Sequence, residues 1–290
     1  MSSAGILLQH LLPHHLISRC VLRITRVRFR PVKNLVTRLF VRGFRPDMSD
    51  AIEPDPLAYP DFNAFFTRAL RPGARPLAGD AATLVSPVDG TVSQLGAIDD
   101  DTLLQAKGRF YTLEALLAGS APKWAAGFHS GSFATIYLAP YNYHRIHMPA
   151  DGTLQEIWYV PGRLFSVNAS AAAAVRNLFA RNERLVLLFQ GPVGAFAVIF
   201  VGALNVGSMA TVWHGDVTPR RPRRGCALPL PAEQERFRAR GEEIGRFNMG
   251  STVILLFARD RAALATQLAS GSVLKMGEQI GQLLPQGSRP

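Results

Sequence analysis

The stretch "NMGSTVILLF" at residues 248–257 places a glycine–serine pair directly before an apolar, β-branched run. The run from Val253 to Phe257 predicts a buried strand. A small Gly–Ser pair at the start of such a strand is usually only a turn. An aspartate upstream and two histidines in the middle of the chain favour a second interpretation, in which Ser251 is a reactive nucleophile.

The composition is that of an apolar globular chain. Its 290 residues suffice for one large domain or two small ones, with 48% hydrophobic and 18% charged residues. No run of 18 uncharged apolar residues occurs, so no membrane-spanning helix is predicted. The two cysteines, Cys20 and Cys226, make neither a disulfide framework nor a ligand-spaced pair. This predicts an intracellular protein without a structural zinc site.

Basic charge is concentrated at the N-terminus. The chain has a net charge of +11, and residues 1–50 carry nine basic and two acidic residues, a net charge of +7. The basic residues are Arg19, Arg23, Arg26, Arg28, Arg30, Lys33, Arg38, Arg42 and Arg45. Such a segment suits a polyanion, and its apolar interleaving favours an anionic membrane surface over nucleic acid, for which no motif is present. The alternative is the solvated basic face of ordinary packing helices.

Two amphipathic helices are predicted in this segment. Residues 5–24 form the first, interrupted at Pro13, and Pro31 opens the second, which ends near Gly43. Both would lie in the headgroup plane of a membrane. A signal peptide is not predicted, because no basic stretch precedes the apolar run and no small-residue cleavage site follows it; an organelle transit peptide stays open. The phenylalanine stripe in "FNAFFTRAL" (residues 62–70) indicates core packing.

The middle of the chain holds the densest group of chemically active residues. In "TIYLAPYNYHRIHMPADGTL" (residues 135–154), strand alternation would place Tyr143, Arg145 and His147 on one face and His144 on the other. An H-x-x-H zinc pair is an alternative, but no acidic third ligand is evident, so no metal site is predicted.

Several further local structures follow from turn residues and apolar runs. Asp89-Gly90, between two valines, predicts a hairpin or tight strand connection, and an aspartate in such a turn needs no chemical role. Thr112 is expected to cap a short helix, and a turn is expected at Lys107-Gly108. Residues 185–213 should form several strands of one sheet or barrel, and residues 273–284 one or two more.

The predicted fold class is α+β. N-terminal amphipathic helices should pack beside a β-rich core, to which residues 252–284 contribute strands. We expect a helical membrane-associating region at 1–70 and a β-rich catalytic domain at 71–290.

Five motifs, in order and sensibly spaced, resemble those of one family. They are "PVDG" at 87–90, "YHRIHMP" at 143–149, "LFSVN" at 164–168, "FARNER" at 179–184 and "NMGSTVI" at 248–254. From about Phe62 to about Gly281 the chain is similar to bacterial phosphatidylserine decarboxylase, a pyruvoyl-dependent, membrane-associated enzyme. It departs at Met249, where a leucine often precedes the glycine; methionine is nearly isosteric with leucine.

The resemblance implies self-cleavage between Gly250 and Ser251. The Ser251 hydroxyl would attack the Gly250 carbonyl, with His147 as base and Asp89 holding the imidazole in its useful tautomer. Gly250 lacks a Cβ, which leaves the attack unobstructed. Elimination and hydrolysis would convert Ser251 to a pyruvoyl group, the covalent cofactor, and no metal is required.

The resemblance also implies the reaction and the partners. The pyruvoyl ketone made from Ser251 would form a Schiff base with phosphatidylserine and release carbon dioxide and phosphatidylethanolamine. His144 would assist decarboxylation or reprotonation, and Phe165, Ser166 and Asn168 would line the headgroup pocket. The product would be a heterodimer of fragments 1–250 and 251–290, bound peripherally to the cytoplasmic face of the cell membrane and binding no nucleic acid. Whether it forms a homodimer stays open.

Two other functions fit parts of the sequence. A conventional serine hydrolase could use Asp89, His147 and Ser251, although the G-x-S-x-G elbow is missing. A non-catalytic basic protein that binds anionic lipid or nucleic acid would leave the aspartate, the histidines and the Gly–Ser pair unexplained. Only the decarboxylase interpretation predicts a chain cut in two on a denaturing gel.

Overall fold

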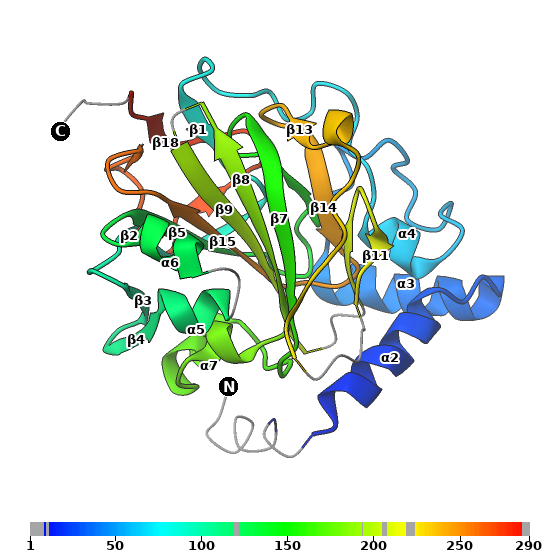
Figure 1. The fold of residues 1–290 in the computed structure, drawn as a ribbon. Coiled ribbons are helices and arrows are strands. Elements are labelled where there is room, and N and C mark those ends of the chain that lie inside the picture. Colours follow the sequence, from blue (N-terminus) through cyan, green and yellow to red (C-terminus); the bar gives the residue numbers. More distant parts are fainter. Residues whose placement is uncertain are drawn as a thin grey trace.

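The computed structural model describes residues 9, 12–118, 122–192, 194–204, 208–218 and 224–285. The described helices are α2 (His14–Thr25), α3 (Arg30–Phe44), α4 (Phe62–Phe66), α5 (Leu113–Leu117), α6 (Pro122–Phe128), α7 (Ala169–Ala174), α8 (Leu178–Arg181) and the 3-10 helix η1 (Glu233–Glu235). In Figure 1, α2, α3 and α4 lie on one side of the long central strands, and α5, α6 and α7 lie on the other.

The described strands form a mainly antiparallel, β-rich core. They are β1 (Thr83–Val85), β2 (Gly90–Ala97), β3 (Thr102–Ala106), β4 (Arg109–Thr112), β5 (Ser132–Tyr137), β6 (Arg145–His147), β7 (Gly152–Val160), β8 (Arg184–Gly191), β9 (Gly194–Val201), β10 (Met209–Thr211), β11 (Gly215–Asp216), β12 (Cys226–Ala227), β13 (Phe237–Arg238), β14 (Glu243–Phe247), β15 (Thr252–Phe257), β16 (Ala262–Leu264), β17 (Val273–Leu274) and β18 (Gln279–Leu283). With the helices they confirm the α+β class.

One nine-stranded sheet dominates the molecule. Its order is β12-β7-β8-β9-β15-β5-β2-β17, and β13 pairs with β7. Smaller sheets have the orders β1-β18-β16, β11-β10-β14-β6 and β3-β4. The C-terminal strands β15, β16, β17 and β18 are therefore shared among the sheets, as the sequence predicted.

Strand β15 is buried on both faces of the nine-stranded sheet. It pairs antiparallel with β5 on one side and with β9 on the other, over all six of its residues. Val253 and Leu255 face one hydrophobic core, whereas Ile254 and Leu256 face the other. Its sequence has no polar alternation because neither face meets water.

The N-terminal arm, which we define as residues 9 and 12–45, packs through fully buried polar residues and through Val36, Phe40 and Val41 of α3, which are partly buried against the phenylalanines of α4. On α2 the buried residues are His14, Ser18 and Thr25, and on α3 they are Lys33 and Thr37. Within the described part of the chain, no helix is long and apolar enough to cross a membrane. The predicted helix before Pro13 falls almost wholly outside the described residues, and the predicted second helix is confirmed as α3.

Local predictions had mixed outcomes. Thr112 caps α5 by accepting a hydrogen bond from the Ala115 amide, and β3 and β4 form a hairpin around Lys107-Gly108, as expected. Of the two alternatives at Asp89-Gly90, the hairpin is wrong and the tight strand connection is confirmed. Strand β1 ends at Val85 and pairs with β18, while β2 begins at Gly90 and pairs with β5 and β17. This stretch therefore connects two sheets.

Candidate active site

Ser251 lies at the entrance to β15, fully buried. Its carbonyl accepts a hydrogen bond from the Leu138 amide at 2.8 Å, which extends the β15–β5 ladder by one step. The Ser251 Oγ has no hydrogen-bond partner among the described residues. A buried hydroxyl without a partner is unfavourable, and a catalytic role is one of the reasons for which proteins retain such a group.

His144 lies against the Gly250 backbone. A Cβ built on Gly250 would be 3.2 Å from His144 Nε2 and 3.3 Å from the Leu138 carbonyl oxygen, so a side chain here would crowd the imidazole. The Phe66 ring packs on the other side of His144, with ring centroids 4.1 Å apart. The glycine thus allows the closest approach of a histidine to the predicted scissile bond.

The hydrogen bonds of His144 fix its tautomer. Its Nδ1 lies 2.8 Å from the Asn142 carbonyl oxygen, which can only accept, so Nδ1 carries the proton. The basic Nε2 then has no partner among the described residues. Burial, helped by the positive charge of Arg68, lowers the pKa of His144 to about 3, and the ring is neutral at physiological pH.

His147 points away from His144 and has both ring nitrogens engaged. Its Nδ1 donates to the Gly241 carbonyl oxygen at 2.8 Å, and its Nε2 lies 2.9 Å from the Tyr143 hydroxyl. Burial lowers the pKa of His147, although the bond to Gly241 opposes the shift. The Gly241 carbonyl, and not Asp89 as the sequence suggested, therefore holds the tautomer of this imidazole.

Asp89 is bound by an arginine and by the backbone of the C-terminal segment. The Arg75 guanidinium donates to both carboxylate oxygens, at 3.0 and 2.7 Å, and also pairs with Asp50 at 2.6 Å. The Met276 amide donates to Asp89 Oδ1 at 2.8 Å. The Asp89 carboxylate raises the pKa of His147 less than Gly241 does, so its influence on the ring is electrostatic and indirect.

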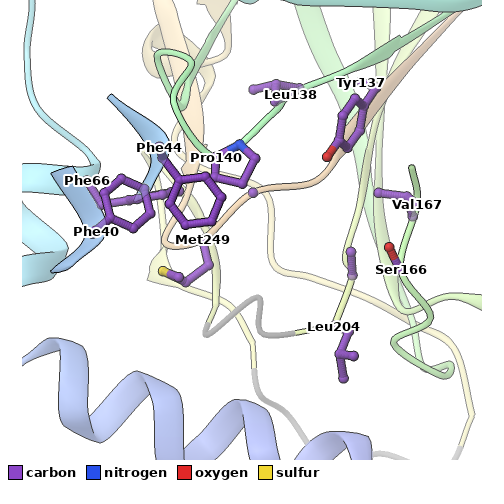
Figure 2. A pocket seen from close by; sticks show the side chains of 12 residues that line it. Phe40, Phe44, Phe66, Tyr137, Leu138, Pro140, Ser166, Val167, Leu204 and Met249 are labelled. Carbon is purple, nitrogen blue, oxygen red and sulfur yellow. The ribbon is translucent and has the colours of Figure 1, made fainter. Parts of the chain in front are cut away.

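A cavity of about 280 Å³ opens beside Gly250. Its described lining residues are Phe40, Phe44, Phe66, Tyr137, Leu138, Pro140, Ser166, Val167, Ala203, Leu204, Met249 and Gly250. Figure 2 shows the three phenylalanines on one side and Ser166 and Val167 on the opposite side. No charged side chain belongs to this described lining, which is mainly apolar.

The three residues predicted for the headgroup pocket have different positions. Ser166 lines the cavity, whereas Phe165 and Asn168 are absent from its described lining. Phe165 is fully buried, beneath the Arg181 guanidinium. Asn168 caps α7 by accepting from the Ala171 amide at 3.0 Å. These two residues shape the loop that presents Ser166.

Sequence reasoning missed several neighbours of the site. Phe66 was expected only in a packing stripe, yet it contacts His144 and lines the cavity together with Phe40 and Phe44 of α3. Arg75, which binds Asp89, was not among the residues predicted for the site. Among the described residues, no group of three His, Cys, Asp or Glu side chains is placed to hold a metal ion.

Comparison with known proteins agrees with this arrangement. The family model described as phosphatidylserine decarboxylase matches residues 62–282, and a second, described as PSD, matches residues 5–45. Similar relatives, each named phosphatidylserine decarboxylase proenzyme, come from Nitrosococcus oceani (48% identity, covering 96% of this chain and 90% of the relative) and Azotobacter vinelandii (49%, covering 94% and 96%). Another is that of Alkalilimnicola ehrlichii (52%, covering 84% and 85%). The chain belongs to the phosphatidylserine decarboxylase family.

Proposed function

We propose that this chain is a proenzyme that cuts itself between Gly250 and Ser251 and then decarboxylates phosphatidylserine to phosphatidylethanolamine. The observation that carries the proposal is a pair of buried, partnerless atoms at one peptide bond. The two atoms are the Ser251 Oγ and the basic Nε2 of His144. This Nε2 lies close to Gly250, the residue that precedes Ser251. The buried hydroxyl suits attack on the neighbouring Gly250 carbonyl, and the neutral imidazole beside the same bond suits later proton transfer to the substrate.

Maturation would use only atoms of the chain and one water. The Ser251 hydroxyl adds to the Gly250 carbonyl carbon, the C–N bond breaks, and the hydroxyl proton passes to the freed amine. Loss of the Ser251 α-proton then breaks the Cβ–O bond and releases Gly250 as a carboxylate. The remaining dehydroalanine tautomerises to an imine, and water displaces ammonia to leave a pyruvoyl group.

The residues present fit such a group at position 251. The position is fully buried, its side-chain oxygen has no competing partner, and the adjoining cavity is apolar. The pyruvoyl group supplies a carbonyl that accepts the electrons left behind by carbon dioxide. Around it, the apolar lining would strip water from the substrate carboxylate, which destabilises the charged carboxylate relative to neutral carbon dioxide.

We assign different stages to the two histidines. His147, influenced electrostatically by Asp89, would serve maturation. Its Nε2 would give up the hydrogen bond with the Tyr143 hydroxyl and accept the proton of the Ser251 hydroxyl. His144 would return the proton to the substrate carbon after decarboxylation, because its Nε2 faces the reacting position. Contact alone would give both stages to His144, so the assignment of His147 to cleavage rests on the motif resemblance.

The exposed apolar residues of the arm support a membrane-bound substrate. The large ones are Leu16, Ile24, Phe29, Val32, Leu35, Leu39 and Phe44. Although α3 packs Phe40 against the phenylalanines of α4, the fully buried residues of α2 and α3 are polar, and these large apolar side chains remain exposed. Together with the basic charge, this face suits peripheral binding to anionic lipid at the cytoplasmic face of the cell membrane.

Self-cleavage predicts two fragments of defined length. Mass spectrometry of the purified protein should find 250 and 40 residues, the smaller fragment with a pyruvoyl N-terminus. Ser251→Ala should stay a single chain without decarboxylase activity, because it lacks the attacking hydroxyl. A fully active protein that remains uncut would exclude the proposal.

The two histidine variants should fail at different stages. His147→Ala should accumulate uncut precursor, since loss of a general base costs about 10²–10⁴ in rate. His144→Ala should be cut, at least in part, yet turn over phosphatidylserine slowly. One gel and one assay on both variants decide the matter. If His144→Ala stays uncut while His147→Ala matures, the two roles are reversed; if both mature and are fully active, neither histidine has the proposed role.

The neutral state of His144 predicts a pH dependence of stability. Folding lowers the pKa of this ring from 6.5 to about 3. Between these two pH values the unfolded chain binds a proton that the folded chain does not bind. Stability should therefore be complete above about pH 6.5 and fall as the pH decreases toward 3. Melting temperatures of Ser251→Ala should decline across this range. Adding His144→Gln should flatten the decline, whereas His129→Gln, at an exposed histidine, should not.

Membrane binding should depend on the outward face of the arm. Leu35→Ser combined with Leu39→Ser should weaken sedimentation with phosphatidylserine-containing vesicles at least about tenfold, from the lost burial of two leucines. Val273→Ser, which changes an exposed valine outside the arm, is the matched control. High salt should weaken binding only in part, because it screens charge but leaves apolar burial intact. Equal binding of the unaltered protein to neutral and anionic vesicles at low salt would contradict the electrostatic contribution.

A further inference from the structure

The loop at residues 164–168 lies between the sheet and the N-terminal arm. It carries Ser166 and Val167 on the wall of the cavity opposite Phe40, Phe44 and Phe66 (Figure 2). The loop is not part of a described strand, so its backbone groups need partners from elsewhere. Side chains from two distant parts of the sequence supply them.

Asn182 holds the loop from the side of the sheet. Its Oδ1 accepts from the Phe165 amide at 3.0 Å, and its Nδ2 donates to the Phe165 carbonyl at 2.9 Å and to the Gly202 carbonyl at 2.8 Å. Asn182 is fully buried. One amide side chain thus pairs with both backbone groups of Phe165, as a neighbouring strand would.

The arm holds the two neighbouring residues from the opposite side. The Leu164 amide donates to His14 Nδ1 at 3.2 Å, and the Ser166 amide donates to Gln9 Oε1 at 2.9 Å. Gln9 is only 4% exposed and His14 only 2%. The His14 ring also meets the Phe165 ring edge-on, with centroids 5.2 Å apart.

These contacts alternate along the loop as hydrogen bonds alternate along a strand. Residues 164 and 166 bond to the arm, and residue 165 bonds to Asn182. Removal of either support would leave buried amides without partners and free the backbone that sets the position of Ser166. The arm is thereby a structural part of the cavity.

We propose that Gln9 and His14 are positioning residues, through which the N-terminal arm holds the 164–168 loop against the headgroup of phosphatidylserine. The proposal rests on the function proposed above and adds to it, because the arm would then build the substrate site as well as bind the membrane. Membrane docking of the arm and the shape of the cavity are coupled through these two side chains.

A soluble substrate separates this role from membrane anchoring. With short-chain phosphatidylserine kept below its critical micelle concentration, Gln9→Ala and His14→Ala should each raise KM about 3- to 10-fold, as for one lost hydrogen bond, with kcat and maturation unchanged. Gln9→Glu keeps an acceptor oxygen and should restore most of the affinity. Gln155→Ala, at an exposed glutamine, should have no effect. Unchanged KM values in the two alanine variants would overturn the proposal.

Hydrogen exchange tests the contact without any activity. In the Ser251→Ala chain, which cannot mature under the proposed function, Gln9→Ala should speed exchange of the Ser166 amide at least about tenfold. The exchange of β15 amides, which pair with β5 and β9 rather than with the loop, should stay within error. Equal exchange at Ser166 with and without Gln9 would show that the arm does not hold the loop. This result is independent of whether the chain cuts itself.

Discussion

The pairing of β15 on both of its edges fixes the place at which the chain can be reactive. From Thr252 to Phe257 every residue is matched with a residue of β5 and a residue of β9, and the Ser251 carbonyl continues the ladder toward Leu138. The serine is therefore rigid on its C-terminal side. Met249 and Gly250, by contrast, belong to no described strand. Backbone movement during a reaction at this bond is confined to the glycine side.

The same pairing determines what a cut would do. Residues 251–290 would remain hydrogen-bonded through β15 in the middle of the large sheet, and through β17 and β18 to β2 and β1. Asp89 also links the two fragments through hydrogen bonds, because it binds Arg75 from one fragment and the Met276 amide from the other. Loss of Asp89 would leave the largely buried Arg75 guanidinium with Asp50 and the Ala74 carbonyl as partners. Replacing Asp89 would therefore weaken this junction in addition to any effect on His147.

The sequence predicted features that are set locally and missed those set by distant partners. The apolar run of β15 and the Thr112 cap depend on a few neighbouring residues, and both are present. Asp89-Gly90 has the residues of a hairpin turn, but the carboxylate is taken by Arg75 and Met276, which no local pattern reveals. The tautomer of His147 likewise depends on Gly241, 94 residues away. Helical spacing predicted the phenylalanine stripe that includes Phe66. It did not predict that the Phe66 ring contacts His144.

The arm shows why periodicity alone does not give the direction of an amphipathic helix. Alternating polar and apolar faces predicted α2 and α3, yet the fully buried residues of both helices are polar, and α3 adds partly buried apolar contacts with the phenylalanines of α4. The partners explain this orientation: Lys33 donates to the Leu57 and Tyr59 carbonyls, and Gln9 and His14 accept from amides of the 164–168 loop. Loops present unpaired backbone groups, which an apolar helix face could cover but not satisfy. Where a helix packs on loops it therefore needs polar residues inside, and the apolar residues that do not pack against α4 are left outside, where a lipid surface can bury them.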